Sequence, residues 1–122
     1  MTIAYWCVLI AGLMPLAATW IAKSRKDFDN ANPREWLAKV GGFRGRAHAA
    51  QLNCFEVLPL FAAAVIIAHL RGATQGTIDM LAIGFIAARV VYIGLYLADL
   101  ATLRSVAWLV GLICTVSMFF VS

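Results

Sequence analysis

Polar and ionisable side chains lie in the first half of FRGRAHAAQLNCFEVLPLFAAAVIIAHL, residues 43–70, whose second half is as apolar as a membrane span. At about 100° per residue, Arg46, Asn53 and Glu56 fall within an arc of about 80° on one helix face. Together they donate and accept hydrogen bonds and carry charges of both signs. Ionisable residues inside a membrane span usually mark a functional site, so this stripe predicts a cleft for a small charged ligand.

A second stripe follows further along the chain. Arg89, Tyr92 and Tyr96 share an arc of about 60° on a helix, and both Arg89 and Glu56 lie near the middle of apolar segments. A lone charge at the bilayer centre costs about 2.5–3.5 kcal/mol or more. Either a direct Glu56–Arg89 ion pair or a shared hydrated cavity is therefore expected. A pair alone could also serve only to fix the helix register.

The composition requires that membrane helices position these stripes. Of the 122 residues, 63% are hydrophobic and 13% are charged, which is outside the range of soluble globular domains. The segments 3–22 and 105–122 contain no charged residue, and a span needs about 20 mostly apolar residues. Positive charges follow the first segment instead of preceding it, so it is predicted to anchor the chain and not to be a cleaved signal peptide.

The expected fold is an all-α membrane protein with a single domain over residues 1–122. Short connections between spans place consecutive helices side by side and antiparallel. The sequence therefore predicts four transmembrane helices in an up-down antiparallel bundle. Their expected ranges are about 3–22, 45–70, 78–97 and 105–121.

Basic residues predict the orientation of the bundle. Seven Lys or Arg residues lie between positions 23 and 46, and Arg104 is expected at the same end, whereas the second connection carries only Arg71. The positive-inside rule places the basic end in the cytoplasm and both termini on the non-cytoplasmic side of the membrane. The formal charge of +4 thus indicates topology and attraction for anionic lipids rather than a nucleic-acid partner.

Cysteine and histidine give no indication of a metal site. Cys7, Cys54 and Cys114 lie far apart inside apolar segments, where cysteines commonly behave as small hydrophobic residues. His48 and His69 are single histidines near helix ends. We therefore expect no disulfide, no metal and no histidine ligand.

The segments RAHAAQLNCFEVLPLF and ARVVYIGLY together resemble the membrane-associated proteins in eicosanoid and glutathione metabolism, the MAPEG family. This family includes microsomal glutathione transferases and leukotriene C synthase. The first matching motif is N-x-x-E-x-x-P, at Asn53, Glu56 and Pro59. The second is R-x-x-Y-x-x-x-Y, at Arg89, Tyr92 and Tyr96. The resemblance covers nearly the whole chain.

The resemblance implies a homotrimer, in a bacterial inner membrane, that holds glutathione between neighbouring subunits near the cytoplasm. It implies transfer of glutathione to a lipophilic electrophile, or reduction of a lipid hydroperoxide. Arg104 resembles the arginine that stabilises the glutathione thiolate. The positions that resemble glutathione contacts are Arg25 or Lys26, Gln51, Asn53, Glu56, Arg89, Tyr92 and Tyr96.

Two positions depart from the family pattern and keep alternatives open. Characterised transferases carry an arginine where Ala49 stands here, and Arg46, one turn earlier, is expected to take its place. Leukotriene C synthase has a second helix-three arginine where this chain has Val91. These departures favour a family-fold protein that binds a lipid or another anionic ligand without glutathione catalysis. A small multidrug exporter is the third hypothesis, but such exporters need a glutamate in helix one, and segment 3–22 has none.

Overall fold

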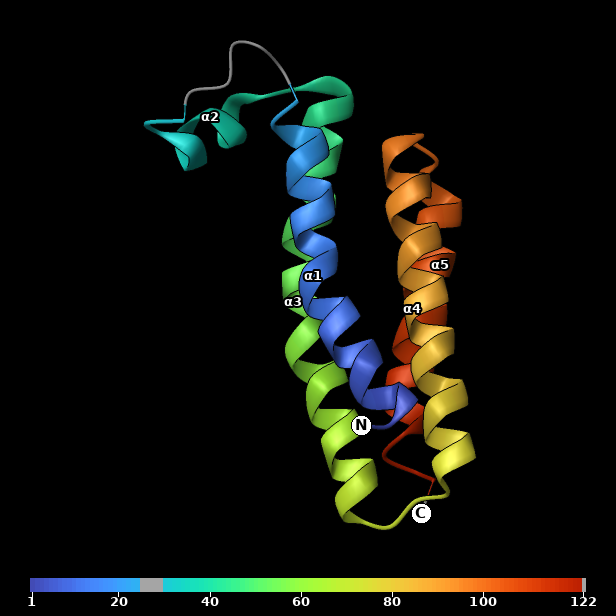
Figure 1. Cartoon of the computed structure of the whole chain (residues 1–122). Coiled ribbons are helices and arrows are strands. Elements are labelled where there is room, and N and C mark those ends of the chain that lie inside the picture. The colour runs from blue at the N-terminus through green and yellow to red at the C-terminus, as the bar shows by residue number, and fades with distance from the viewer. Residues whose placement is uncertain (25–29, 122) are drawn as a thin grey trace.

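The structure is a computed structural model that describes residues 1–24 and 30–121. These residues form helices and connections, and no strand occurs among them, so the predicted all-α class is confirmed. Four long helices alternate in direction, and the first residues and the segment after α5 lie at the end opposite α2 (Figure 1). The helices are α1 (Ile3–Ala22), α2 (Pro33–Lys39), α3 (Gly42–Leu70), α4 (Gln75–Leu97) and α5 (Ala101–Ser117).

Local hydrogen bonds stabilise the polar starts of two helices: α4 begins earlier than the predicted residue 78, and α1 begins at residue 3 as predicted. The side chain of Gln75 donates to Asp79 Oδ1 over 2.7 Å, which holds the polar TQGT segment in the first turn of α4. At the start of α1, Thr2 Oγ1 accepts the Tyr5 backbone N–H over 3.2 Å as an N-cap. Polar residues thus belong to the first turn of α4, whereas Thr2 caps α1 from outside the helix.

Proline shapes α1 at a buried position. Pro15 lies inside the helix and has no N–H to donate to the preceding turn. The Thr19 hydroxyl donates to the Pro15 carbonyl over 2.8 Å, which adds a local side-chain bond at this point. The N-terminal half of α1 leans across toward α4 (Figure 1), as expected for a helix bent near a proline.

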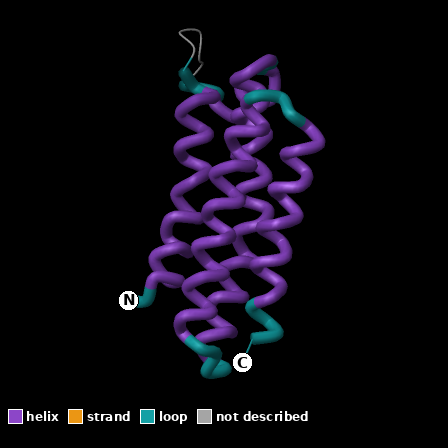
Figure 2. Tube along the Cα trace, turned by 90° about the vertical axis from the view of Figure 1, so that its right-hand side faces the viewer, coloured by secondary structure: helices purple, strands orange, loops and turns teal. Residues whose placement is uncertain are grey.

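Small residues bring the long helices close together. The main core contains alanines from α1, α3 and α4 around two stacked rings, Phe61 and Phe85, whose centroids are 3.9 Å apart. Close approach through small side chains is typical of helices that pack inside membranes. Figure 2 shows the long helices side by side, with the connections gathered at the two ends.

Three of these helices, α1, α3 and α4, are long and apolar enough to cross a membrane. Helix α5 is apolar but has 17 residues. Large hydrophobic side chains remain exposed along the outside of the bundle, including Leu13, Ile83 and Ile113. An apolar outer surface of this extent is expected where lipid, and not water, surrounds the protein.

Candidate functional site

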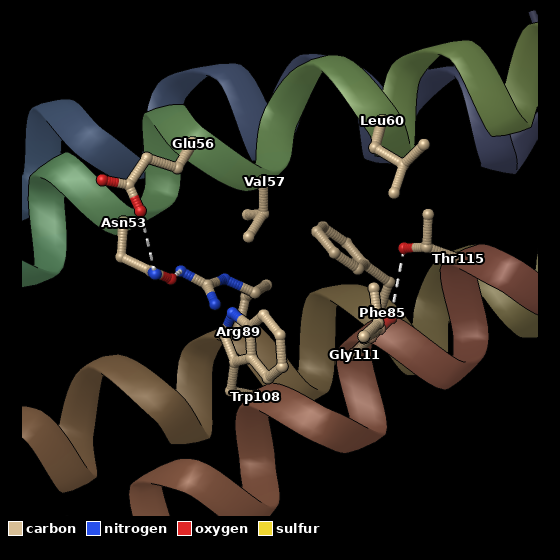
Figure 3. A pocket seen from close by; sticks show the side chains of 10 residues that line it. Asn53, Glu56, Val57, Leu60, Phe85, Arg89, Trp108, Gly111 and Thr115 are labelled. Atoms are coloured by element: carbon tan, nitrogen blue, oxygen red, sulfur yellow. Dashed lines mark hydrogen bonds between the residues drawn. The ribbon is translucent and has the colours of Figure 1, made fainter.

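A cavity of about 220 Å³ lies between α3, α4 and α5 (Figure 3). Asn53, Glu56 and Arg89 form its polar end. Its remaining walls come from apolar or small residues and one threonine, namely Val57, Leu60, Phe85, Trp108, Gly111, Leu112 and Thr115. The cavity therefore joins a charged end to an apolar chamber.

Arg89 is the buried charged residue of this cavity, with 2% of its surface exposed. Its Nη2 donates to Asn53 Oδ1 over 2.8 Å and to Cys54 Sγ over 3.4 Å. Its Nε and Nη1 have no hydrogen-bond partner among the described residues. A buried guanidinium with unmatched N–H groups is unfavourable by itself, and an anionic ligand would supply the missing acceptors.

Asn53 connects the two charges that the sequence predicted to lie at similar depth. Its Nδ2 donates to Glu56 Oε2 over 3.4 Å, while its Oδ1 accepts from Arg89. No ion pair joins Glu56 and Arg89 directly in the described structure, because the asparagine amide lies between them. Of the two expected arrangements, the shared cavity is therefore present and the direct pair is not.

The α4 stripe forms a stack of rings and cations. The Arg89 Cζ atom lies 4.1 Å from the Tyr92 ring centroid. The Tyr92 and Tyr96 rings meet edge to face with centroids 5.7 Å apart. The Arg104 Cζ atom, from the first turn of α5, lies 4.2 Å from the Tyr96 centroid. The predicted stripe is thus continuous, and it connects the two arginines.

A second cavity of about 200 Å³ adjoins the first. Its lining residues are Asn53, Tyr92, Arg104, Ser105 and Trp108. Asn53 and Trp108 also line the first cavity, so the two arginines lie at neighbouring chambers. The described part of the site contains two guanidinium groups and one carboxylate, which favours a ligand with net negative charge.

Other predicted site residues lie elsewhere. Arg46 Nε donates to the Leu97 carbonyl over 3.2 Å, and the Gln51 side chain lies 3.2 Å from the His48 ring. Neither Arg46 nor Gln51 lines these two cavities, and Tyr96 does not line them either. The predicted carboxylate-binding residues, Arg25 and Lys26, lie outside the described residues.

Trp108 is a cavity residue that the sequence did not predict. Its ring lines both cavities, because it follows Arg104 by one helical turn and shares that face of α5. Cys54 was expected to be a simple apolar residue, yet its sulfur accepts a hydrogen bond from Arg89. The spacing Arg104-x-x-x-Trp108 is the feature of the sequence that could have identified Trp108 as a cavity residue.

Comparison with protein-family models matches residues 3–122 to the MAPEG family. No curated protein and no solved structure matches the chain. The family match spans nearly the whole sequence, and three helices are long and apolar enough to cross a bilayer. From this match and these helices we conclude that the chain is an integral membrane protein that belongs to the MAPEG family.

Proposed function

We propose that this protein is a glutathione-dependent transferase or peroxidase that acts on lipophilic electrophiles. The observation that carries the proposal is the buried Arg89 guanidinium at the cavity wall, with Nε and Nη1 unpartnered among the described residues. A carboxylate accepts such N–H groups in a strong, charge-assisted arrangement. Glutathione carries two carboxylates, one amino group and a thiol, and the site offers groups of matching charge.

Each polar group has a proposed partner on glutathione. Arg89 would receive one carboxylate, and Glu56 would accept the N–H groups of the cationic amine. Asn53 is bonded to both residues and would orient them while contacting the peptide backbone of glutathione. The other carboxylate falls to Arg25 or Lys26 in the basic first loop.

Arg104 is the proposed catalytic residue. A free thiol with a pKa of about 8.5 is mostly protonated at neutral pH, and a nearby cation favours the reactive thiolate. In the transferase reaction, the thiol loses its proton and the thiolate sulfur forms a bond to an electrophilic carbon. The carbon either loses a leaving group, which departs with the bonding electron pair, or is part of an activated alkene whose π bond breaks and whose neighbouring carbon then takes up a proton. In the peroxidase reaction, two glutathione molecules are oxidised to the disulfide as a hydroperoxide is reduced to an alcohol and water. The electrophile would reach the site through the bilayer.

The position of Glu56 supports a site shared between subunits. Glu56 lies near the middle of α3, yet its side chain is exposed in the single chain, beside exposed Leu52 and Phe55. An exposed carboxylate at this depth would face lipid unless another subunit covers it. We infer a homotrimer in which a neighbour closes the cleft. We further propose that α5 is the fourth membrane span. In this orientation the basic end of the bundle lies in the cytoplasm, and both termini lie on the other side of a bacterial inner membrane.

Titration calorimetry on detergent-purified protein tests the proposal, with glutathione and S-hexyl glutathione as ligands. We expect saturable binding that Glu56→Ala abolishes. Arg104→Ala should slow conjugation while leaving glutathione affinity within about twofold. Glu35→Ala is the matched control, since Glu35 is an exposed residue that pairs with Lys39 on α2 over 3.2 Å. Absence of glutathione binding to a well-folded oligomer would reject the proposal.

A lipid-binding member without glutathione catalysis is the second candidate. The apolar chamber beyond Arg89, lined by Val57, Leu60, Phe85 and Leu112, favours it because an acyl chain would fit there with its carboxylate at the guanidinium. Binding of a fatty acid in the same calorimetric experiment, with no response to glutathione, would select this function.

A further inference from the structure

An open groove of about 530 Å³ lies between α4 and α5, and each of its lining residues is glycine, alanine, valine or leucine. Buried Ala88 and Ala107 form its floor, and the half-exposed side chains of Val91, Val106 and Val110 form its walls. Val91 stands where leukotriene C synthase has an arginine, so in this chain the wall is uncharged. The groove therefore offers contacts to an apolar ligand and no hydrogen bond to a polar one.

The length of the groove matches one leaflet of a bilayer. On α4 the groove extends from Gly84, near the middle of the helix, to Leu95, near its end. A rise of 1.5 Å for each residue from 84 to 95 gives a length of about 16 Å. The hydrocarbon core of a bilayer is about 30 Å thick, so one leaflet contributes about half of it. The groove is thus about as long as the hydrocarbon of a single leaflet.

The two ends of the groove differ. At the middle of the membrane α4 and α5 come into contact, since a Cβ added to Gly84 would lie 3.1 Å from Cys114 Sγ. At the other end Leu95 and Leu103 lie beside the turn that joins the two helices. This turn is at the same end of the bundle as α2, which is the basic, cytoplasmic end in the proposed orientation (Figure 1). The groove is therefore closed at mid-membrane and begins at the level of the lipid headgroups.

The groove and the Arg89 cavity lie on opposite faces of the α4–α5 pair. Val91 follows Arg89 by two residues, and Val110 follows Trp108 by two. Two residues of a helix turn through about 200°, so these side chains point about 160° apart. A subunit that closes the cleft at Glu56 covers the cavity face. The groove face is then left to the bilayer.

We propose that this groove binds one acyl chain of a phospholipid from the cytoplasmic leaflet. The carboxyl end of the chain lies at Leu95 and Leu103, and its terminal methyl group lies near Gly84. The surrounding leaflet supplies chains of this length and direction, with their headgroups at the basic end of the bundle. This site is separate from the glutathione cleft and does not depend on glutathione chemistry.

Photolabelling of the intact, detergent-purified oligomer tests the site. Trace phosphatidylglycerol with a diazirine near the methyl end of one acyl chain should label residues around Gly84 and Val110. A diazirine near the carboxyl end should instead label residues around Leu95 and Leu103. We expect both reactions to saturate and to be competed by unlabelled phosphatidylglycerol. The outer face of α1, with exposed Leu9, Leu13 and Leu16, is the internal control and should show weak labelling without saturation.

A matched pair of substitutions tests the shape of the groove. Ala87→Phe places a large ring in the groove at an exposed position, so folding should be preserved. Displacing about two methylene groups of the bound chain should weaken phospholipid competition about tenfold. Ile83→Phe adds a ring to the same helix at an exposed residue outside the groove and should leave competition unchanged.

Three outcomes would overturn the proposal. Groove labelling that rises linearly with lipid, as on α1, would mean that only ordinary bulk lipid is present. With p-benzoylphenylalanine in place of Val106, a crosslinked dimer would show that a second subunit covers the groove. Competition by palmitate but not by phospholipid would assign the groove to a free fatty acid. None of these measurements uses glutathione, so they decide the lipid site even if the proposed catalytic function fails.

Discussion

Replacing Arg89 by methionine separates a ligand-binding role for this cation from a role in holding the helices together. The substitution keeps a long, flexible side chain and removes the charge and every donor. Arg89 is 2% exposed, donates to Asn53 and Cys54, and leaves two nitrogens without partners among the described residues. These contacts determine what the bundle and the ligand would each lose.

The substitution should change the free energy of unfolding little, because the contacts it removes and the unpartnered donors it removes have effects of similar size. Methionine loses a charge-assisted hydrogen bond to Asn53, which contributes about 1.5–3 kcal/mol, and the contact with Tyr92, which contributes about 0.5–2 kcal/mol. It also removes two buried N–H groups without partners, each unfavourable by about 1–3 kcal/mol. The losses and gains cancel to within a few kcal/mol. We expect the thermal unfolding midpoint to change by no more than about 10 °C.

The effect on ligand affinity has no such compensation. Removing one partner of a buried, hydrogen-bonded charge pair costs about 2–5 kcal/mol, which weakens binding between about 30-fold and several thousand-fold. Calorimetry with glutathione and thermal unfolding in the same detergent measure the two effects. Arg71→Met is the control, since Arg71 is exposed at the far end of the bundle and donates to the Phe119 carbonyl over 3.3 Å.

A midpoint lowered by more than about 15 °C, with glutathione affinity unchanged, would refute this reasoning and assign Arg89 to helix packing. A purely structural polar residue follows that pattern, because its removal disturbs the bundle and not the ligand. An unchanged midpoint with unchanged affinity would likewise place the anion site away from Arg89. The two measurements therefore distinguish the roles without a crystal structure of the complex.

Three further predictions test other parts of the arrangement. Glu56→Gln keeps a hydrogen-bonding group beside Asn53 but removes the charge, so calorimetric glutathione affinity should fall at least about tenfold with little change in unfolding midpoint. Asp99→Gly should hold or raise the midpoint, whereas Asp99→Val should lower stability by about 1–2 kcal/mol, because Asp99 has a φ of 61°. Gly84→Ala should lower the midpoint, since the added Cβ would lie 3.1 Å from Cys114 Sγ, and Cys114→Ala in the same chain should restore it.

Helical periodicity predicted the residues at the polar end of the cavity but not how they bond. Asn53 and Glu56 are three residues apart on one face of α3, and Arg89 lies on the facing helix, so their convergence follows from period and topology. Whether Glu56 and Arg89 would pair directly depends on side-chain rotamers and helix separation, which the sequence does not specify. The asparagine amide occupies the intervening position, and this decides the outcome.

The contribution of α5 was harder to predict because it depends on one turn. Asp99 adopts the left-handed conformation that usually calls for glycine, so the sequence carried no clear signal for the tight reversal after Leu97. That reversal determines which face of α5 turns toward α4. As a result, the Arg104 guanidinium lies over the Tyr96 ring, and the Trp108 side chain lines both cavities. The hydrogen bond of Arg46 was equally hard to predict, since its partner carbonyl belongs to the end of a distant helix, and its expected contact with the ligand stays a prediction.

The two charges at the centre of the bundle differ in exposure, and in the proposed homotrimer this difference would link ligand binding to assembly. Arg89 is buried within one chain, whereas Glu56, joined to it through Asn53, is exposed at the polar end of the cavity. A ligand that contacts both groups must extend from the interior of one subunit to its surface. If a second subunit covers that surface, the ligand binds the assembled form more tightly than the separate chains. By linkage it then stabilises the assembly by the same free energy. On this proposal, the cationic interior and the exposed carboxylate are two parts of one site, which association of subunits would complete.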